Sequence, residues 1–91
     1  MKTSPSSARI LAGYPDKNAS LFKRIGVPLG DPAAWIELDS KRIALVRDLE
    51  MDRVVKMSHA DDVTCPAEHA PPFGLSSDRE TATAQAATQL L

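Results

Sequence analysis

Two short runs with the alternation of β-strands, separated by a tight polar turn, constrain this chain more than any other feature of its sequence. In the runs 34–38 and 42–47, apolar residues alternate with polar or smaller ones. Only Asp39, Ser40 and Lys41 separate the two runs. Strands joined by so few residues pair as an antiparallel hairpin. The second run has apolar residues on both faces, so we expect it to be covered on both sides.

A helix is expected before this hairpin, over residues 18–25. Its apolar residues recur at the spacing of one helical face. Asp16 or Asn18 is placed to accept hydrogen bonds from the first backbone N–H groups. Gly26 favours the left-handed conformation that ends such a helix, and Pro28 prevents its continuation.

Two helices and one strand are expected after the hairpin. Apolar spacing predicts a helix over 49–57, with Asp48 as its N-cap. A short strand follows over 62–65. The motif Ser77-Asp78-Arg79-Glu80 has the form of a capping box, which predicts a helix over 78–91 that starts from Ser77.

These elements define the fold class as α/β, in the order α-β-β-α-β-α. The sheet is expected to be small, mixed or antiparallel, with about three strands (the hairpin 34–47 and the strand 62–65) and helices flanking it. A chain of 91 residues supports one modest core. We expect residues 1–8, rich in Ser and Pro, to be a disordered arm and residues 9–91 to form a single domain.

Charge and cysteine content exclude several classes of protein. The formal net charge is −1 and the charged residues are interspersed, so neither nucleic acid nor an anionic membrane is expected as a partner. The one cysteine, Cys65, rules out an intrachain disulfide. No stretch approaches the roughly 20 apolar residues that cross a bilayer, and the start of the chain lacks a signal peptide. We expect a soluble cytoplasmic protein.

Most residues with catalytic or metal-binding chemistry lie in the segment 59–69, which contains His59, Cys65 and His69. Imidazole and thiolate are good zinc ligands. Pro66, however, prevents a helix through Cys65, so the spacing of four residues does not align Cys65 with His69. The pattern is more typical of a buried strand cysteine flanked by loop histidines. We predict no catalytic residue, no cofactor-binding residue and no metal ligand in this chain.

Trp35 is the residue for which a role beyond local structure is most worth considering. The simpler interpretation is that it packs under a helix. The alternative is that Trp35 borders a ligand cleft or a subunit interface, where tryptophan is enriched.

The residues of the hairpin and the following helix resemble a known family. Trp35-Ile36-Glu37-Leu38 and the run from Ile43 to Arg53 are similar to the N-terminal domain of bacterial Xaa-Pro dipeptidases and aminopeptidases, of the creatinase/prolidase group. The run from Gly74 to Gln85 and the opening Arg9 to Gly13 share this resemblance, which covers residues 9–91.

The resemblance implies that the parent protein has two domains with different roles. The family's N-terminal domain is a mixed sheet flanked by helices, longer than this chain, and it bounds the substrate cleft and helps to form a dimer. A C-terminal "pita-bread" domain supplies two Asp, one His and two Glu ligands to a pair of divalent metals, such as manganese, cobalt or zinc. None of those ligands corresponds to a residue of this chain. The resemblance leaves open whether the parent is a dipeptidase or an aminopeptidase.

Three hypotheses of function follow. The first is a non-catalytic and incomplete N-terminal domain of a metal-dependent Xaa-Pro peptidase. Its partners would be its own C-terminal catalytic domain and a second copy, and the parent's substrate a proline-containing peptide. The second is a free-standing interaction module that pairs its open strand edges with another protein. The third, ranked last, is a small enzyme that uses Cys65 as nucleophile.

Overall fold

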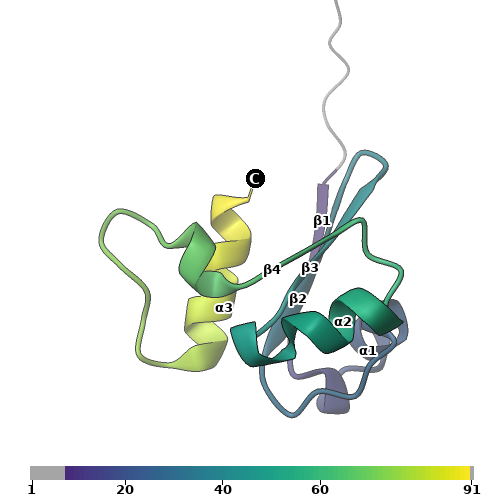
Figure 1. Cartoon of the computed structure of the whole chain (residues 1–91). Coiled ribbons are helices and arrows are strands. Elements are labelled where there is room, and N and C mark those ends of the chain that lie inside the picture. The colour runs from purple at the N-terminus through teal and green to yellow at the C-terminus, as the bar shows by residue number, and fades with distance from the viewer. Residues whose placement is uncertain (1–7, 91) are drawn as a thin grey trace, which may run out of the picture.

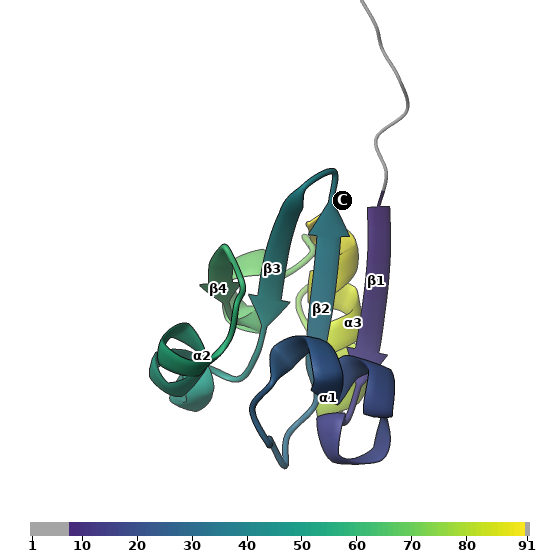
Figure 2. The ribbon, with the colours of Figure 1, turned by 90° about the vertical axis from the view of Figure 1, so that its right-hand side faces the viewer.

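The computed structural model describes residues 8–90, in which a four-stranded sheet lies between two layers of helices (Figures 1 and 2). The sheet has the strand order β1-β2-β3-β4. In chain order, with η marking a 3₁₀-helix, the elements are β1 (Ala8–Gly13), η1 (Pro15–Lys17), α1 (Ala19–Ile25), β2 (Ala33–Leu38), β3 (Lys41–Leu45), η2 (Asp48–Glu50), α2 (Met51–Met57), β4 (Asp62–Thr64), η3 (Pro66–His69) and α3 (Arg79–Gln89).

The predicted hairpin is confirmed and forms the centre of the sheet. β2 and β3 pair antiparallel, with Leu38 opposite Lys41. The turn therefore consists of Asp39 and Ser40 alone, one residue fewer than the sequence suggested. Asp39 adopts a φ of 54°, in the left-handed region that Asp tolerates better than most residues.

The sheet has four strands, and the expectation of about three was wrong. The additional strand is β1, which pairs antiparallel with β2 from Ala8↔Leu38 to Gly13↔Ala33. The sequence of β1 alternates only weakly, because its two large apolar residues, Ile10 and Leu11, are adjacent. Both are partly buried, on opposite faces of the sheet. The contacts that make β1 a strand come from residues 20 to 30 positions away. Ala8, expected to end the N-terminal arm, begins β1, and the rest of that expected arm, residues 1–7, lies outside the described residues.

The fourth position in the sheet belongs to the short predicted strand. β4 runs parallel to β3, with Ile43 opposite Asp62 and Leu45 opposite Thr64. The ladder extends past β3 on one side, because Val46 N–H donates to the Thr64 carbonyl at 2.9 Å. A parallel neighbour requires a crossover connection, and α2 provides it. The sheet is consequently mixed.

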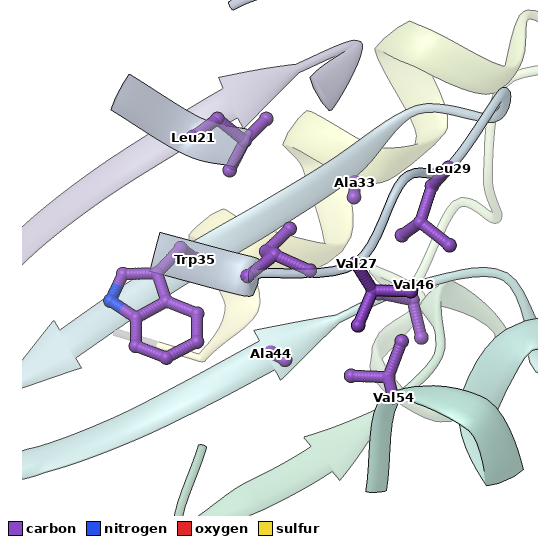
Figure 3. Packing of buried hydrophobic residues seen from close by; sticks show 9 residues of the cluster. Leu21, Val27, Leu29, Ala33, Trp35, Ala44, Val46 and Val54 are labelled. Atoms are coloured by element: carbon purple, nitrogen blue, oxygen red, sulfur yellow. The ribbon is translucent and has the colours of Figure 1, made fainter. Parts of the chain in front are cut away.

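Both faces of the hairpin are buried, as its apolar pattern predicts. One face packs against α1 and α2, and Figure 3 shows this cluster, in which Trp35 and Ala44 of the sheet gather with Leu21 of α1 and Val54 of α2. The other face packs against α3 through Ile36. Figure 1 shows α3 on one side of the sheet and α1 and α2 on the other. The core residues that β2, β3 and Val46 contribute alternate between the two faces: Ala33, Trp35, Ala44 and Val46 on the first, Ala34, Ile36, Ile43 and Leu45 on the second.

The first helix begins and ends where the sequence predicts. Asn18, not the alternative Asp16, is the N-cap of α1, and its Oδ1 accepts a hydrogen bond from Leu21 N–H at 3.1 Å. Gly26 ends the helix with a φ of 73°, and its N–H donates to the Phe22 carbonyl at 2.7 Å. Glycine adopts this conformation without the steric cost of a Cβ atom.

The other two helices begin later than predicted. Asp48 starts the 3₁₀ turn η2 and does not cap an α-helix, and α2 proper begins at Met51. The capping box from Ser77 was wrong as well: the N-cap of α3 is Asp78, whose Oδ2 accepts hydrogen bonds from Thr81 N–H at 2.9 Å and from Thr81 Oγ1 at 2.7 Å. A carboxylate one position later caps the helix through the N–H three residues after it, as a serine would, and also interacts favourably with the helix dipole.

Shortening one buried side chain tests the two-faced core. Ile36 is 0% exposed. We expect Ile36→Val to lower the free energy of unfolding by about 1 kcal/mol, because one buried methyl group is removed. The measurement is urea unfolding followed by circular dichroism. Leu49→Ala is the matched control: Leu49 is 74% exposed, so its truncation should change stability by less than about 0.5 kcal/mol. Equal losses in the two variants would contradict the core assignment.

The start of α3 offers a second test. The hydrogen bonds from Thr81 lower the pKa of the Asp78 carboxyl below its ordinary 3.8. Since the folded state holds Asp78 ionised, its contribution to stability is present at neutral pH and is lost as the pH falls below about 3.8. We expect Asp78→Ala to lower the Tm at pH 7 by several degrees and Ser77→Ala to change it little, with the difference shrinking in acid. If Ser77→Ala lowers the Tm more than Asp78→Ala does, Ser77 is the N-cap, as the capping-box motif predicts.

Candidate functional site

A groove of about 360 Å³ opens where the carboxyl ends of β3 and β4 meet the start of α3. Ligands of α/β proteins commonly bind beyond the carboxyl ends of parallel strands. Four segments distant in sequence form the walls, and Figure 1 shows the beginning of the η2–α2 segment beside α3. The lining residues are Asp31, Pro32, Arg47, Asp48, Cys65, Pro66, Ala67, Leu75, Arg79, Ala82 and Thr83.

A cluster of two cations and one anion lies in this groove. The Asp31 carboxylate lies 3.5 Å from Arg47 Nη1 through its Oδ2 and 3.6 Å from Arg79 Nη1 through its Oδ1. The Asp31 side chain is 30% exposed, that of Arg47 is 37% exposed and that of Arg79 is 54% exposed. Ion pairs this open to water stabilise a fold by at most about 1 kcal/mol each. The cluster therefore contributes little to the stability of the fold.

Cys65 lines the same groove, but His69, the base considered for it, bonds to another residue. Cys65 directly follows β4 and is 6% exposed, as expected for a buried strand cysteine. The predicted obstacle to a Cys65–His69 pair is present: Pro66 begins the 3₁₀-helix η3, and the His69 ring hydrogen-bonds to Thr64 instead. A nucleophilic cysteine needs a base within hydrogen-bond distance. The geometry thus gives no support to the hypothesis of a cysteine-dependent enzyme.

Thr64, Glu68 and His69 form a polar cluster that the sequence did not reveal. The Thr64 hydroxyl donates to Glu68 Oε1 and lies 2.9 Å from His69 Nε2. A hydroxyl has one proton, so if Glu68 accepts it, His69 Nε2–H must be the donor to the hydroxyl oxygen. In that arrangement His69 is not a base toward Thr64. The cluster ties η3 to the end of β4 and is structural.

The remaining residues of the 59–69 segment are separated from one another. His59 is exposed, and Asp61 Oδ2 accepts a hydrogen bond from Arg42 N–H at 2.7 Å. This bond, followed by the Arg42 side chain, lowers the pKa of the Asp61 carboxyl. Within residues 8–90 no group of three or more His, Cys, Asp or Glu side chains is placed to hold a metal ion.

Trp35 was expected to pack under a helix, with a place at a cleft or interface as the alternative. It is 3% exposed, lies in the core cluster between the sheet and α1 and α2, and does not line the groove. Its indole Nε1–H donates to Glu37 Oε2 at 2.9 Å. Arg24 of α1 and Arg9 of β1 pair with the same carboxylate at 3.4 and 3.9 Å. The Trp35 hydrogen bond first, and then the two arginines, lower the pKa of the Glu37 carboxyl. Trp35 thus anchors an ion-pair cluster that joins β1, β2 and α1.

Sequence reasoning missed the groove because its charged residues lie far apart along the chain. Arg47 ends a predicted strand and Arg79 lies in the predicted capping box, whereas Asp31 lies outside the predicted helices and strands. One signal was available: the first residues after two neighbouring parallel strands meet at one edge of a sheet. The sequence did not reveal that β3 and β4 are parallel neighbours, so this signal could not be used.

Removing one hydroxyl tests the Thr64 cluster. Thr64 is 8% exposed, and we expect Thr64→Val to lower the free energy of unfolding by about 1 kcal/mol, because both hydrogen-bond partners lose their contact. Thr64→Ser keeps the hydroxyl and should lose clearly less. Urea denaturation of both variants gives the comparison. If the serine variant is the less stable of the two, the methyl group and not the hydroxyl is what matters.

Comparisons with protein-family models, curated proteins and solved structures find no match to this chain. The fold itself defines the class: a small mixed α/β domain with a four-stranded sheet and helices on both of its faces. No helix within the described part of the chain has the length and apolar character to span a membrane.

Proposed function

We propose that this chain is a non-catalytic N-terminal domain of a metal-dependent peptidase that cleaves peptide bonds preceding proline, of the creatinase/prolidase group. The resemblance of the runs 35–53 and 74–85 to that group is the starting point. A mixed sheet flanked by helices is also the architecture that the resemblance implies, and the observed fold is compatible with it.

One structural observation carries the proposal. The run 35–53 forms the centre of the sheet and the run 74–85 forms the start of the helix that covers one of its faces. The two runs meet in the groove, where Arg47 and Asp48 from the first face Arg79 and Ala82 from the second. Two runs that resemble the same family and also pack on each other support the view that they belong to one family domain.

In this proposal the chemistry lies outside the chain. A two-metal hydrolase needs several carboxylates converging on a bridging hydroxide. The carboxylates of Asp31, Glu37, Asp61 and Asp62 are instead distributed over the surface and paired with arginine or lysine. The domain would bound the substrate cleft and support subunit contacts. Trp35 would contribute indirectly, by holding β2 against α1.

A second function is favoured by one specific observation. Within the described residues, the outer edges of β1 and β4 have no neighbouring strand, since the sheet order begins with one and ends with the other. Exposed edges can add a strand from a partner protein. The alternative is therefore an interaction module that pairs through these edges.

The reading frame beyond the Leu91 codon separates the two functions. We expect it to continue and to encode two Asp, one His and two Glu as metal ligands. The complete product should hydrolyse an Ala-Pro dipeptide, lose this activity on chelation and regain it with Mn²⁺. An Ala-Ala dipeptide is the matched substrate control. A stop codon directly after Leu91 would refute the peptidase proposal and leave the interaction module, which predicts a complex in sedimentation experiments and protection of β1 or β4 amides from hydrogen exchange.

A further inference from the structure

The groove at the carboxyl ends of β3 and β4 has the properties of a small-ligand site that neither proposed function assigns. Its volume of about 360 Å³ lies within the range, roughly 300–1,000 Å³, of pockets that bind small molecules. Apolar side chains supply much of the wall, among them Pro66, Leu75 and Ala82. Charged side chains are confined to one cluster and to Asp48.

The arginines of the groove retain hydrogen-bonding capacity. Each guanidinium has five N–H donors. Asp31 approaches Arg47 at 3.5 Å and Arg79 at 3.6 Å, through one nitrogen of each. Both distances exceed the 2.7–2.9 Å that is usual for a charge-assisted hydrogen bond. The Asp31 carboxylate is thus shared between two arginines without a short hydrogen bond to either. These three residues together carry a formal charge of +1.

The position of Arg79 is not explained by the helix that carries it. Arg79 is the first residue of α3, and a cation in the first turn of a helix opposes the helix dipole. Helix stability therefore gives no reason for an arginine at this position. Arg79 instead lines the groove, where its guanidinium lies 3.6 Å from the Asp31 carboxylate that Arg47 also approaches.

The charge balance indicates what kind of anion fits. Asp48 also lines the groove, so the formal charges of its four charged residues sum to zero. A dianion would meet two carboxylates, Asp31 and Asp48. A monoanion meets the same two carboxylates with half the charge, so it is repelled less than a dianion, and an apolar body matches the apolar wall.

We propose that this groove binds a small carboxylate with an apolar body, with the carboxylate held by Arg47 and Arg79 and the apolar part against Pro66 and Leu75. The ligand is either a free short-chain acid or the carboxyl terminus of a peptide with an apolar last residue. The two sources share the chemistry of recognition. The proposal does not depend on the peptidase assignment, because binding is measured on this chain alone.

The test is a titration of the ¹⁵N-labelled chain followed by NMR. Sodium pentanoate and acetyl-Gly-Leu represent the two sources; pentanamide, the C-terminal amide of acetyl-Gly-Leu and inorganic phosphate are the controls. We expect saturable shifts at amides of Arg47, Cys65 and Arg79 with at least one carboxylate. We expect weaker binding of its neutral amide and of phosphate. The carboxylate that binds more tightly identifies the source.

Three variants examine the role of charge. Arg79→Gln should weaken binding about fivefold, because it removes one cation from contact with the carboxylate. Asp31→Asn should tighten binding about threefold, since the competing anion is lost. Arg9→Gln is the matched control: it removes an arginine charge from β1, outside the groove, and should leave the affinity unchanged.

Several outcomes would overturn the proposal. Equal binding of each carboxylate and its amide would show that the arginines do not recognise the charge. Tighter binding of phosphate would contradict the preference for a monoanion with an apolar body. Absence of shifts with both carboxylates, in a chain whose spectrum is that of a folded protein, would exclude the site. If Arg79→Gln and Arg9→Gln weaken carboxylate binding equally, the effect comes from the overall charge of the protein and not from the groove.

Discussion

Burial of both faces of the β2–β3 hairpin is the constraint on which the rest of the structure depends. Ile36 on one face and Trp35 on the other are almost wholly removed from water. Each buried side chain of this kind contributes roughly 1.5–3 kcal/mol relative to its exposed state. A two-stranded ribbon alone cannot supply that burial, so α1 and α2 must cover one face and α3 the other.

The groove is a consequence of how these layers are connected. α2 lies between β3 and β4 in the chain and provides the crossover that allows β4 to run parallel to β3. Both strands consequently end at the same edge of the sheet. The chain then has to return to cover the second face, and α3 begins near that edge. Backbone connectivity thus brings Arg47 and Arg79 together around Asp31, although 32 positions separate the two arginines.

The two proposals concern different levels of organisation. The peptidase assignment concerns the larger protein, and its support is the resemblance together with the packing of the two similar runs on each other. The carboxylate site concerns a local cluster of charges in an apolar groove, and the evidence for it is the geometry of that groove alone. Both agree in assigning no bond-breaking chemistry to the residues of this chain.

The sequence by itself determined the hairpin, α1 with its Gly26 end, the existence of two later helices and the short strand β4, and it left the N-cap of α1 open between Asp16 and Asn18. These are set by local rules: side-chain period, capping and turn chemistry act over a few residues. Only the tertiary structure decided that residues 8–13 are a strand, that Asp78 and not Ser77 begins α3, and that the charges of the groove converge. The edge strand depends on pairing with β2, and the groove depends on strands being parallel neighbours; both are contacts between distant residues, which no local pattern encodes. At Ser77 two adjacent residues could each cap the helix, and the conformation of the preceding loop, which local rules do not specify, decides between them.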